Sequence, residues 1–407
     1  MDLSPHRWTE AGEALLPELV ALRRSIHEEP EIGLLTPLTT AKARAALEGL
    51  PLEIREGTST TGFVAILRGP ANGRTVLLRG DMDALPMHED TGLPFSSKTA
   101  GAMHACGHDT HVAMLAGAAR ALCERRDELA GTVMFMFQPG EEGHHGARFM
   151  LEDGLLDPLP DAAFALHVYP NIPTGQFAGR AGPLLAAADR FVITFKGRGG
   201  HASAPHDTVD PIPVACEFVT AVQAMVTRRI SVFEPVVVTV ARIESGSTNN
   251  VIPETALLEG TIRSLSQASR AKAHEGVRRL AANIAAAHLA EATVIGKPGM
   301  ISTVASARCA AEAVGVAERA ARALYGEDAW LTLPDPIMGA EDFSYVLQKV
   351  PGAMVYLGAT PEGGDWRQCC PLHSNRIVLE EKVMARGVAM HCAFAETFLA
   401  EGFAAGG

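Results

Sequence analysis

The first half of the chain alternates short apolar runs with longer segments of helical period. Residues 12–28 and 40–49 are predicted to be amphipathic helices. The segment 111–126 has apolar residues at 112, 115, 116, 119 and 122, which also indicates a helix, and Asp109 or Thr110 is expected to cap it. Four apolar runs predict strands: GFVAILRG at 62–69, RTVLLRGDMD at 74–83, GTVMFMFQ at 131–138 and AAFALHV at 162–168, of which the last two are expected to be buried. Strands that alternate with helices predict an α/β domain with a central sheet.

The organisation changes between residues 187 and 298. The strand DRFVITFKG, a helix at 210–229, the strands PVVVTVARIES and ALLEGTIRSL, a helix at 267–288 and the strand EATVIGK follow one another. This β-α-β-β-α-β order matches the ferredoxin-like pattern and predicts a small α+β domain inserted at 187–298. The first domain then resumes with helices at 307–325 and 380–400, so residues 1–186 and 299–407 are expected to form one discontinuous domain.

Composition and charge indicate which kinds of molecule the protein does not bind. The 407 residues are 47% apolar and carry a net charge of −12, which repels nucleic acid and anionic lipid, so neither is expected as a partner. No run of about 18 apolar residues occurs, so no membrane span is expected, and the N-terminal residues do not resemble a signal peptide. The seven cysteines are an odd number without regular spacing, which indicates a reduced, cytoplasmic protein.

Polar side chains follow the predicted strands at the point where each strand ends. Asp81 and Asp83 follow one strand, the pair Glu141 and Glu142 follows another, and His167 ends a third. The stretch MHACGHDTH, at 103–111, adds Cys106 and His108 on a loop that leads into a helix, and seven of the fifteen histidines lie between 88 and 167. Ligands of open α/β sheets bind at the carboxyl ends of strands, so these residues are expected to meet at one edge.

A thiolate, imidazoles and a carboxylate together favour Zn, Mn, Co or Ni over Mg or Ca. One glutamate of the pair can bind the metal while the other takes a proton from water. Two alternatives stay open. The glutamate pair can be an ordinary helix start, and Cys106 can be a nucleophile with His108 as its base. The nucleophile hypothesis leaves the glutamate pair and His167 without a role, and no oxyanion-hole signature accompanies it.

Seven motifs occur in the order seen in the aminoacylase–carboxypeptidase family of binuclear metallohydrolases (peptidase M20). They are RGDMDALP, HACGHDTH, FQPGEEG, LHVYP, GRGGHASAPH, NVIP with GTIR, and LHSNR. The sequence most resembles the hippurate hydrolase and N-acyl-amino-acid amidohydrolase branch, over roughly residues 15–400. The resemblance implies a zinc-peptidase-like catalytic domain with a central mixed sheet, and an inserted ferredoxin-like lid and dimerisation domain.

Carried over by motif, the resemblance implies two divalent transition-metal ions per chain. Glu141 would be the general base, and Asp83 would orient a group of the metal site. His201 would stabilise the oxyanion in the active site of a partner subunit, and Asn250 and Arg263 would hold a substrate carboxylate. The metal ligands would be Cys106, in the position where other branches place a bridging aspartate, together with His108, Glu142, His167 and His373.

The implied reaction is hydrolysis of N-acyl-L-amino acids to a carboxylic acid and a free amino acid, by a homodimer. A dipeptidase or carboxypeptidase on the same scaffold is the alternative enzyme. An inactive metal-binding protein is the non-enzymatic alternative, and the retained Glu141 argues against it. Cys369 and Cys370, just before His373, are not explained by the family pattern.

Overall fold

The structure is a computed structural model that describes residues 6–295 and 306–403. The chain divides into two units. Unit 1 comprises residues 1–184, 308–335 and 342–407, and unit 2 comprises residues 185–307 and 336–341. The boundary predicted between residues 298 and 299 lies outside the described residues. Within the described part of the chain, no helix combines the length and apolarity that crossing a membrane requires.

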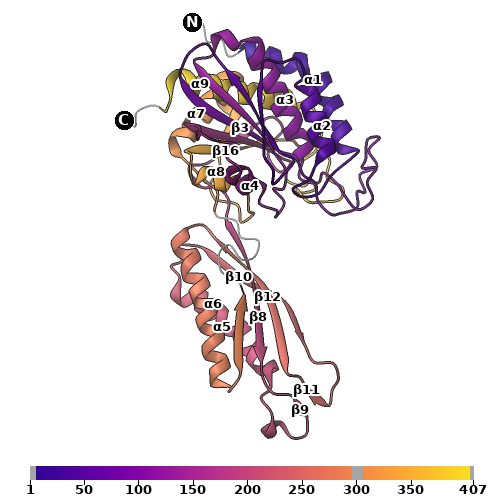
Figure 1. Cartoon of the computed structure of the whole chain (residues 1–407), viewed down its shortest axis with the longest axis vertical. Helices are drawn as coiled ribbons and strands as arrows, with labels where there is room; N and C mark the ends of the chain where they lie inside the picture. The colour runs from indigo at the N-terminus through magenta and orange to yellow at the C-terminus, as the bar shows by residue number, and fades with distance from the viewer. Residues whose placement is uncertain (1–5, 296–305, 404–407) are drawn as a thin grey trace. The chain divides into compact units, whose positions relative to one another are not determined.

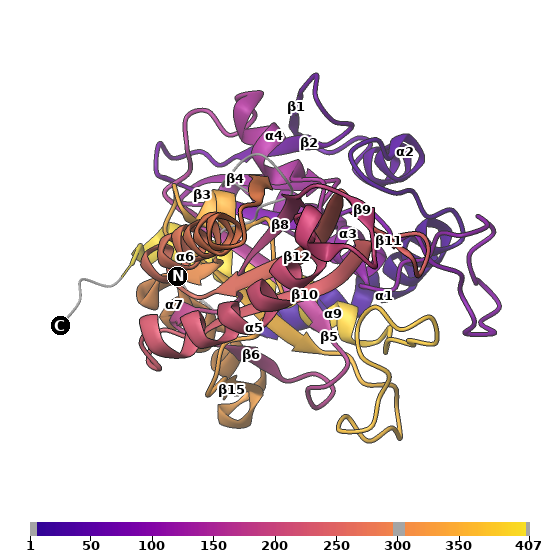
Figure 2. The ribbon, with the colours of Figure 1, turned by 90° about the horizontal axis from the view of Figure 1, so that it is seen from below.

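Unit 1 contains an eight-stranded mixed sheet in the order β1-β2-β4-β3-β5-β16-β6-β15. In Figure 2 the labels of this sheet run from β1 and β2 at the top to β6 and β15 at the bottom. β3 lies parallel to both β4 and β5, and β16 lies parallel to β5. These central strands come from the apolar runs and are buried along nearly their whole length, as strands covered on both faces are. The strands are β1 (Glu53–Glu56), β2 (Phe63–Arg68), β3 (Arg74–Asp81), β4 (Gly131–Gln138), β5 (Ala162–Tyr169), β6 (Phe177–Gly179), β15 (Trp330–Thr332) and β16 (Gly352–Gly358).

An inner set of helices lies against this sheet, and α1 packs on the outside of that set. Both α3 and α9 contact β3, α7 contacts β16, and α1 packs on α3 and α9 (Figure 1). Nearly every residue of α3 is buried because the helix lies between the sheet and α1. The helices are α1 (His6–His27), α2 (Pro37–Ala46), α3 (His108–Glu124), α4 (Gly146–Glu152), α7 (Ala311–Tyr325), α8 (Ser344–Leu347) and α9 (Val383–Glu401).

The predicted cap of α3 is wrong. The helix begins at His108, after Gly107 at φ 87°, and neither Asp109 nor Thr110 caps it. Asp109 lies in the first turn and is bound to α1 instead. Its Oδ2 lies 2.6 Å from Arg23 Nε and 2.8 Å from His27 Nδ1. A buried carboxylate is stabilised by such charged partners, and this use of Asp109 removes it from the capping role.

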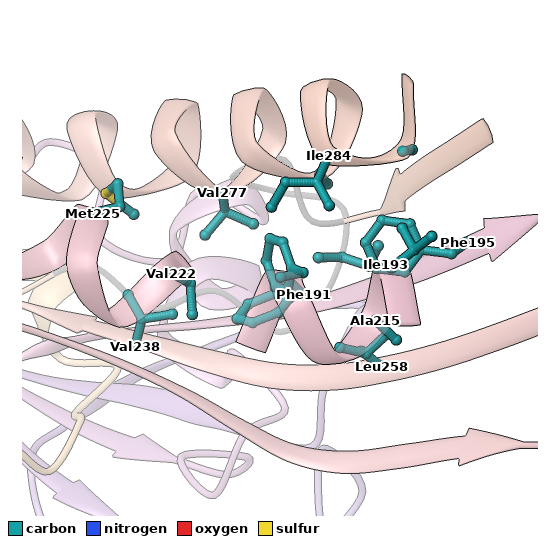
Figure 3. Close-up of a cluster of buried hydrophobic side chains, with 14 of the residues drawn as sticks. Phe191, Ile193, Phe195, Ala215, Val222, Met225, Val238, Leu258, Val277 and Ile284 are labelled. Atoms are coloured by element: carbon teal, nitrogen blue, oxygen red, sulfur yellow. The ribbon is translucent and has the colours of Figure 1, made fainter. Parts of the chain in front are cut away.

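Unit 2 has a four-stranded antiparallel sheet in the order β10-β12-β8-β13, and its elements follow one another as β-α-β-β-α-β. Burial alternates along β8 and β12, so one face of the sheet is covered and the other is partly exposed. Helices α5 and α6 cover one face (Figure 1), and Phe191, Val222 and Val277 pack between sheet and helices (Figure 3). The elements are β8 (Ala187–Lys196), α5 (Pro211–Arg229), β10 (Val236–Ser245), β12 (Thr255–Ser264), α6 (Gln267–Ala287) and β13 (Glu291–Ile295).

Two short ribbons complete the strands. In unit 2, β9 (Gly200–His201) pairs with β11 (Val251–Ile252), and in unit 1, β7 (Gly182–Pro183) pairs with β14 (Arg308–Cys309). All seven cysteines of the chain are free thiols.

Candidate metal centre

The carboxyl ends of three neighbouring strands carry the predicted polar residues of unit 1. β4, β3 and β5 lie side by side and parallel. Asp83 follows β3 by two residues, Glu141 and Glu142 follow β4 by three and four, and His167 lies near the end of β5. Parallel strands present their carboxyl ends along one edge, which is how residues distant in sequence reach one site.

Five side chains form two overlapping groups that share Cys106. One group joins Cys106 to His108 and His167, and the other joins Cys106 to Glu142 and His373, with the potential ligand atoms of each group all within 4.8 Å of one another. Cys106 Sγ lies 3.5 Å from His167 Nε2, and His373 Nε2 lies 3.1 Å from Glu142 Oε1. The structure thus brings together all five residues that the sequence proposed as ligands.

The backbone orients two of the histidines. His108 Nδ1 lies 2.8 Å from the Asp83 carbonyl oxygen, and His167 Nδ1 lies 2.7 Å from that of Val168. A carbonyl acceptor places the ring proton on Nδ1 and leaves the lone pair of Nε2 for a metal. His108 Nε2 is buried without a hydrogen-bond partner, and His167 Nε2 faces the shared thiol. A buried ring nitrogen without a hydrogen-bond partner can bind a cation once it has lost its proton, so the residues present suit the expected ions.

Asp83 holds the glutamate pair through the backbone. Its Oδ1 accepts a hydrogen bond from Glu141 N at 2.9 Å, and its Oδ2 accepts one from Glu142 N at 3.0 Å. The carboxylate is buried at 1% exposure, so both bonds are shielded from water. The orienting role implied for Asp83 therefore has a specific form here, because it fixes the two residues that follow β4.

Burial and neighbouring charges shift the pKa values of the side chains in this centre. Burial raises the pKa of the Cys106 thiol. Burial lowers the pKa of His108, but the charge of Asp81 outweighs this effect and raises it well above its usual value. Hydrogen bonds to Cys106 and Glu142 raise the pKa of His373 to about 10. A divalent ion must displace such protons from its ligands, so its binding is coupled to pH.

The backbone at His373 is also unusual. Its φ is 67°, in the left-handed region that residues other than glycine rarely adopt, and its N–H donates to the Ala105 carbonyl oxygen at 2.9 Å. This bond ties the loop that carries His373 to the loop that carries Cys106. Strain of this kind occurs where the surroundings fix a residue for function.

The sequence did not single out several residues that border the centre. His111 binds Asp81 through Nδ1, and its Nε2 accepts a hydrogen bond from Val168 N at 2.9 Å. Arg79 is 2% exposed and pairs with Asp81 and Asp342. The signal that could have identified Arg79 is its place as a charged residue inside the apolar run RTVLLRGDMD, since a buried arginine needs buried acids.

Unit 2 brings His201 and Asn250 together but separates them from Arg263. His201 pairs with Val251 across the β9–β11 ribbon, and Asn250 O accepts a hydrogen bond from Ala202 N at 3.1 Å. This ribbon continues from the Thr255 end of β12, and Arg263 lies eight residues further along the same strand. At about 3.4 Å per residue, the two ends are about 27 Å apart. Asn250 and Arg263 of one chain are therefore too far apart to bind the same carboxylate, so a shared role would need one of them from a second chain.

The sheet edge and the two ligand groups that share a thiol define a candidate binuclear hydrolase centre on an α/β domain. The family model of Peptidase family M20/M25/M40 matches residues 77–397, and the chain belongs to this family. It is accordingly an M20 metallohydrolase that acts on amide or peptide bonds.

Curated relatives and solved structures agree with this assignment. N-acetylcysteine deacetylase of Bacillus subtilis strain 168 is 40% identical over 349 residues, which cover 86% of this chain and 90% of that protein. Thermostable carboxypeptidase 1 of Saccharolobus solfataricus is 37% identical over 386 residues, which cover 93% and 95%. The crystal structure of the Bacillus subtilis YXEP protein, described as a dinuclear metal-binding peptidase of the M20 family, matches with a TM-score of 0.81 and 34% identity, over 95% and 99%.

Proposed function

We propose that the protein hydrolyses N-acyl-L-amino acids to a carboxylic acid and a free amino acid, with two divalent transition-metal ions per chain. The observation that supports this best is the pair of ligand groups that share Cys106, with Glu141 beside them. His108, Glu141 and Glu142 also place ligand atoms within 4.8 Å of one another. One carboxylate of the pair can therefore bind a metal while its neighbour stays available as a base.

In the proposed assignment, Cys106, His108 and His167 hold one ion, and Cys106, Glu142 and His373 hold the other. Zn, Mn, Co and Ni suit this mixture of sulfur, nitrogen and oxygen. Bound ions of this kind lower the pKa of a water molecule and polarise a carbonyl oxygen.

Glu141 removes a proton from the attacking water and later delivers a proton to the leaving nitrogen. Asp83 keeps Glu141 in place by its hydrogen bond to the backbone. The relative named a deacetylase removes an acyl group, and this favours an N-acyl substrate for the present chain.

The separation of His201 and Asn250 from Arg263 supports a composite site. We propose a homodimer in which the partner contributes His201 and Asn250, while Arg263 binds the substrate carboxylate bidentately. His201 can take part because it is exposed, and its Nδ1 is held by Ser203 Oγ at 2.8 Å. In this proposal unit 2 is the ferredoxin-like lid and dimerisation domain.

A carboxypeptidase or dipeptidase activity is the second candidate, and the relative named a carboxypeptidase favours it. Both candidates use the same centre and differ in what occupies the acyl side. The cysteine-nucleophile hypothesis is weaker, because burial raises the pKa of the Cys106 thiol and so reduces the thiolate that would attack. We also propose a cytoplasmic location, in keeping with seven unpaired cysteines.

The test is a panel of substrates offered to protein reconstituted with Zn, Mn, Co or Ni in turn. The panel contains N-acetyl, N-benzoyl and N-indolylacetyl amino acids, matched dipeptides, and the same compounds with the α-carboxylate amidated. The proposal expects the highest kcat/KM on an N-acyl amino acid and a large loss on amidation. Preference for dipeptides would favour the second candidate.

A further inference from the structure

A buried carboxylate outside the metal centre binds both ends of the loop that carries Glu141. Asp342 is fully buried, and its Oδ1 accepts a hydrogen bond from Gln138 Nε2 at 2.7 Å. Its Oδ2 accepts one from Ala147 N at 3.0 Å. Gln138 ends β4 and Ala147 lies in the first turn of α4, so a single side chain links the two residues between which the glutamate pair lies.

Asp342 also contacts Glu141 itself. Its backbone N–H lies 3.4 Å from Glu141 Oε1. Asp83 already fixes the backbone N–H of both glutamates, but nothing in that contact directs the carboxylate of Glu141. The bond from Asp342 acts on the side chain, so the two aspartates restrain different parts of the same residue.

Arg79 supplies the positive charge that a buried Asp342 needs. Its Nη2 lies 3.3 Å from Asp342 Oδ1, and its Nε donates to Gln138 Oε1 at 2.9 Å. A carboxylate without a partner is costly in the interior, whereas one that accepts several hydrogen bonds beside an arginine is held in a single orientation. We call Arg79, Gln138 and Asp342 the Asp342 cluster.

The end of the loop has a second attachment. His145, the last residue before α4, has a φ of 62°, and its Nδ1 lies 3.1 Å from the hydroxyl of Tyr345, three residues after Asp342. Residues 342–345 thus bind the loop at its start, in its middle and at its end. A loop fixed at so many points can hold a general base with the accuracy that proton transfer needs.

From these contacts we infer that Asp342 is a positioning residue for Glu141. The inference rests on the proposed function, in which Glu141 is the general base. The isosteric change Asp342→Asn replaces one acceptor oxygen by an N–H group. That group must face the side-chain donors of Arg79 and Gln138 or the N–H of Ala147. A buried donor left unpaired costs free energy. If the loop shifts to relieve this cost, Glu141 moves out of position and kcat falls at least about tenfold.

The experiment compares Asp342→Asn with Glu396→Gln, a matched exchange of carboxylate for amide. Glu396 is 18% exposed on α9, pairs with Arg7, and accepts a hydrogen bond from Trp8 Nε1 at 2.8 Å. The readouts are kcat and KM on the best amide substrate, metal content, and hydrogen–deuterium exchange of peptides covering residues 138–147. D342N is expected to lower kcat at least about tenfold, leave KM and metal content unchanged, and speed exchange in this loop. E396Q is expected to leave all four at the wild-type values.

An unchanged kcat, or a loss of kcat that matches a loss of metal, would overturn the inference. If D342N does not fold, Gln138→Leu removes the Gln138–Asp342 bond and is held to the same outcomes. The exchange measurement needs no substrate. If wild-type protein cleaves no N-acyl amino acid, the proposed substrate fails, while unchanged loop exchange in D342N would still overturn the positioning role.

Discussion

Replacing His27 by glutamine should remove a pH-dependent part of the stability of unit 1. His27 is 2% exposed, with Nδ1 2.8 Å from Asp109 Oδ2 and Nε2 3.3 Å from Glu89 Oε1. Burial lowers the pKa of His27, but the charge of Asp109 and the hydrogen bonds to Asp109 and Glu89 outweigh it. The result is a rise from 6.5 to about 9.

The direction of the pH dependence follows from the number of protons bound to folded and to unfolded protein. Between pH 6.5 and about 9, folded protein carries a proton on His27 that unfolded protein has lost, so stability falls as pH rises. At 1.36 kcal/mol per pKa unit, the contribution is about 3 kcal/mol below pH 6.5, and it vanishes above the folded pKa. Burial raises the pKa of Glu89, but hydrogen bonds from His27, Thr91 and Ser97 lower it to about 2; because this includes the His27 contact seen from the other partner, it is not added.

All three tryptophans, Trp8, Trp330 and Trp366, lie in unit 1, so fluorescence during urea unfolding reports on this unit. The free energy of unfolding is measured for wild type and H27Q at pH 6, 7.5 and 9. The difference between them should shrink by about 3 kcal/mol across this range. A difference that stays constant with pH would refute the assignment of a charged His27. Arg44→Gln, which breaks an exposed pair with Glu56, is the control and should show little pH dependence.

Three further predictions concern the centre. Cys106→Ser should weaken the binding of both ions, because the thiol belongs to both ligand groups. Competition with a chelator measures the affinity, and loss of one ion alone would contradict the shared role of Cys106. Glu141→Gln should keep the metal content and lose about 10²–10⁴-fold in kcat, whereas Glu142→Gln should lower the metal content. The reverse result would mean that Glu142 is the base and Glu141 the metal ligand. Mixing a His201→Ala chain with a Glu141→Gln chain should restore activity, up to about a quarter of wild type, if subunits exchange. Exchange without recovery would place His201 in its own chain or outside the site.

The sequence predicted those parts of the fold and site that depend on local pattern. Apolar runs located the strands β2, β3, β4 and β5, because burial on both faces requires continuous apolar residues. The polar residues at strand ends reached one edge as expected. Contacts between segments that are distant in the sequence could not be predicted from the pattern of apolar and polar residues. The use of Asp109 by α1, and of Asp342 by the loop after β4, depends on tertiary neighbours that no spacing reveals.

The separation of Asn250 from Arg263 was missed for a different reason. Motif resemblance assigns roles to residues without stating which chain supplies them, and both residues carried the same role. Arg263 lies near the end of β12, whereas Asn250 precedes the β11 strand that leads into the start of β12. Geometry within a single unit was therefore needed to separate contributions that the sequence had grouped.

The insertion of unit 2 into unit 1 determines the order in which the protein can fold. Strands β1 to β5 are synthesised first, but β5 finds its other neighbour, β16, only after residue 352. All strands of the four-stranded sheet lie between, in 187–295, so unit 2 can form while one edge of β5 is still unpaired. An open apolar edge invites pairing with other chains, which makes this interval the one most exposed to aggregation. His167 lies on that strand and His373 follows β16, so during synthesis the full ligand set is present only after residue 373 has been added.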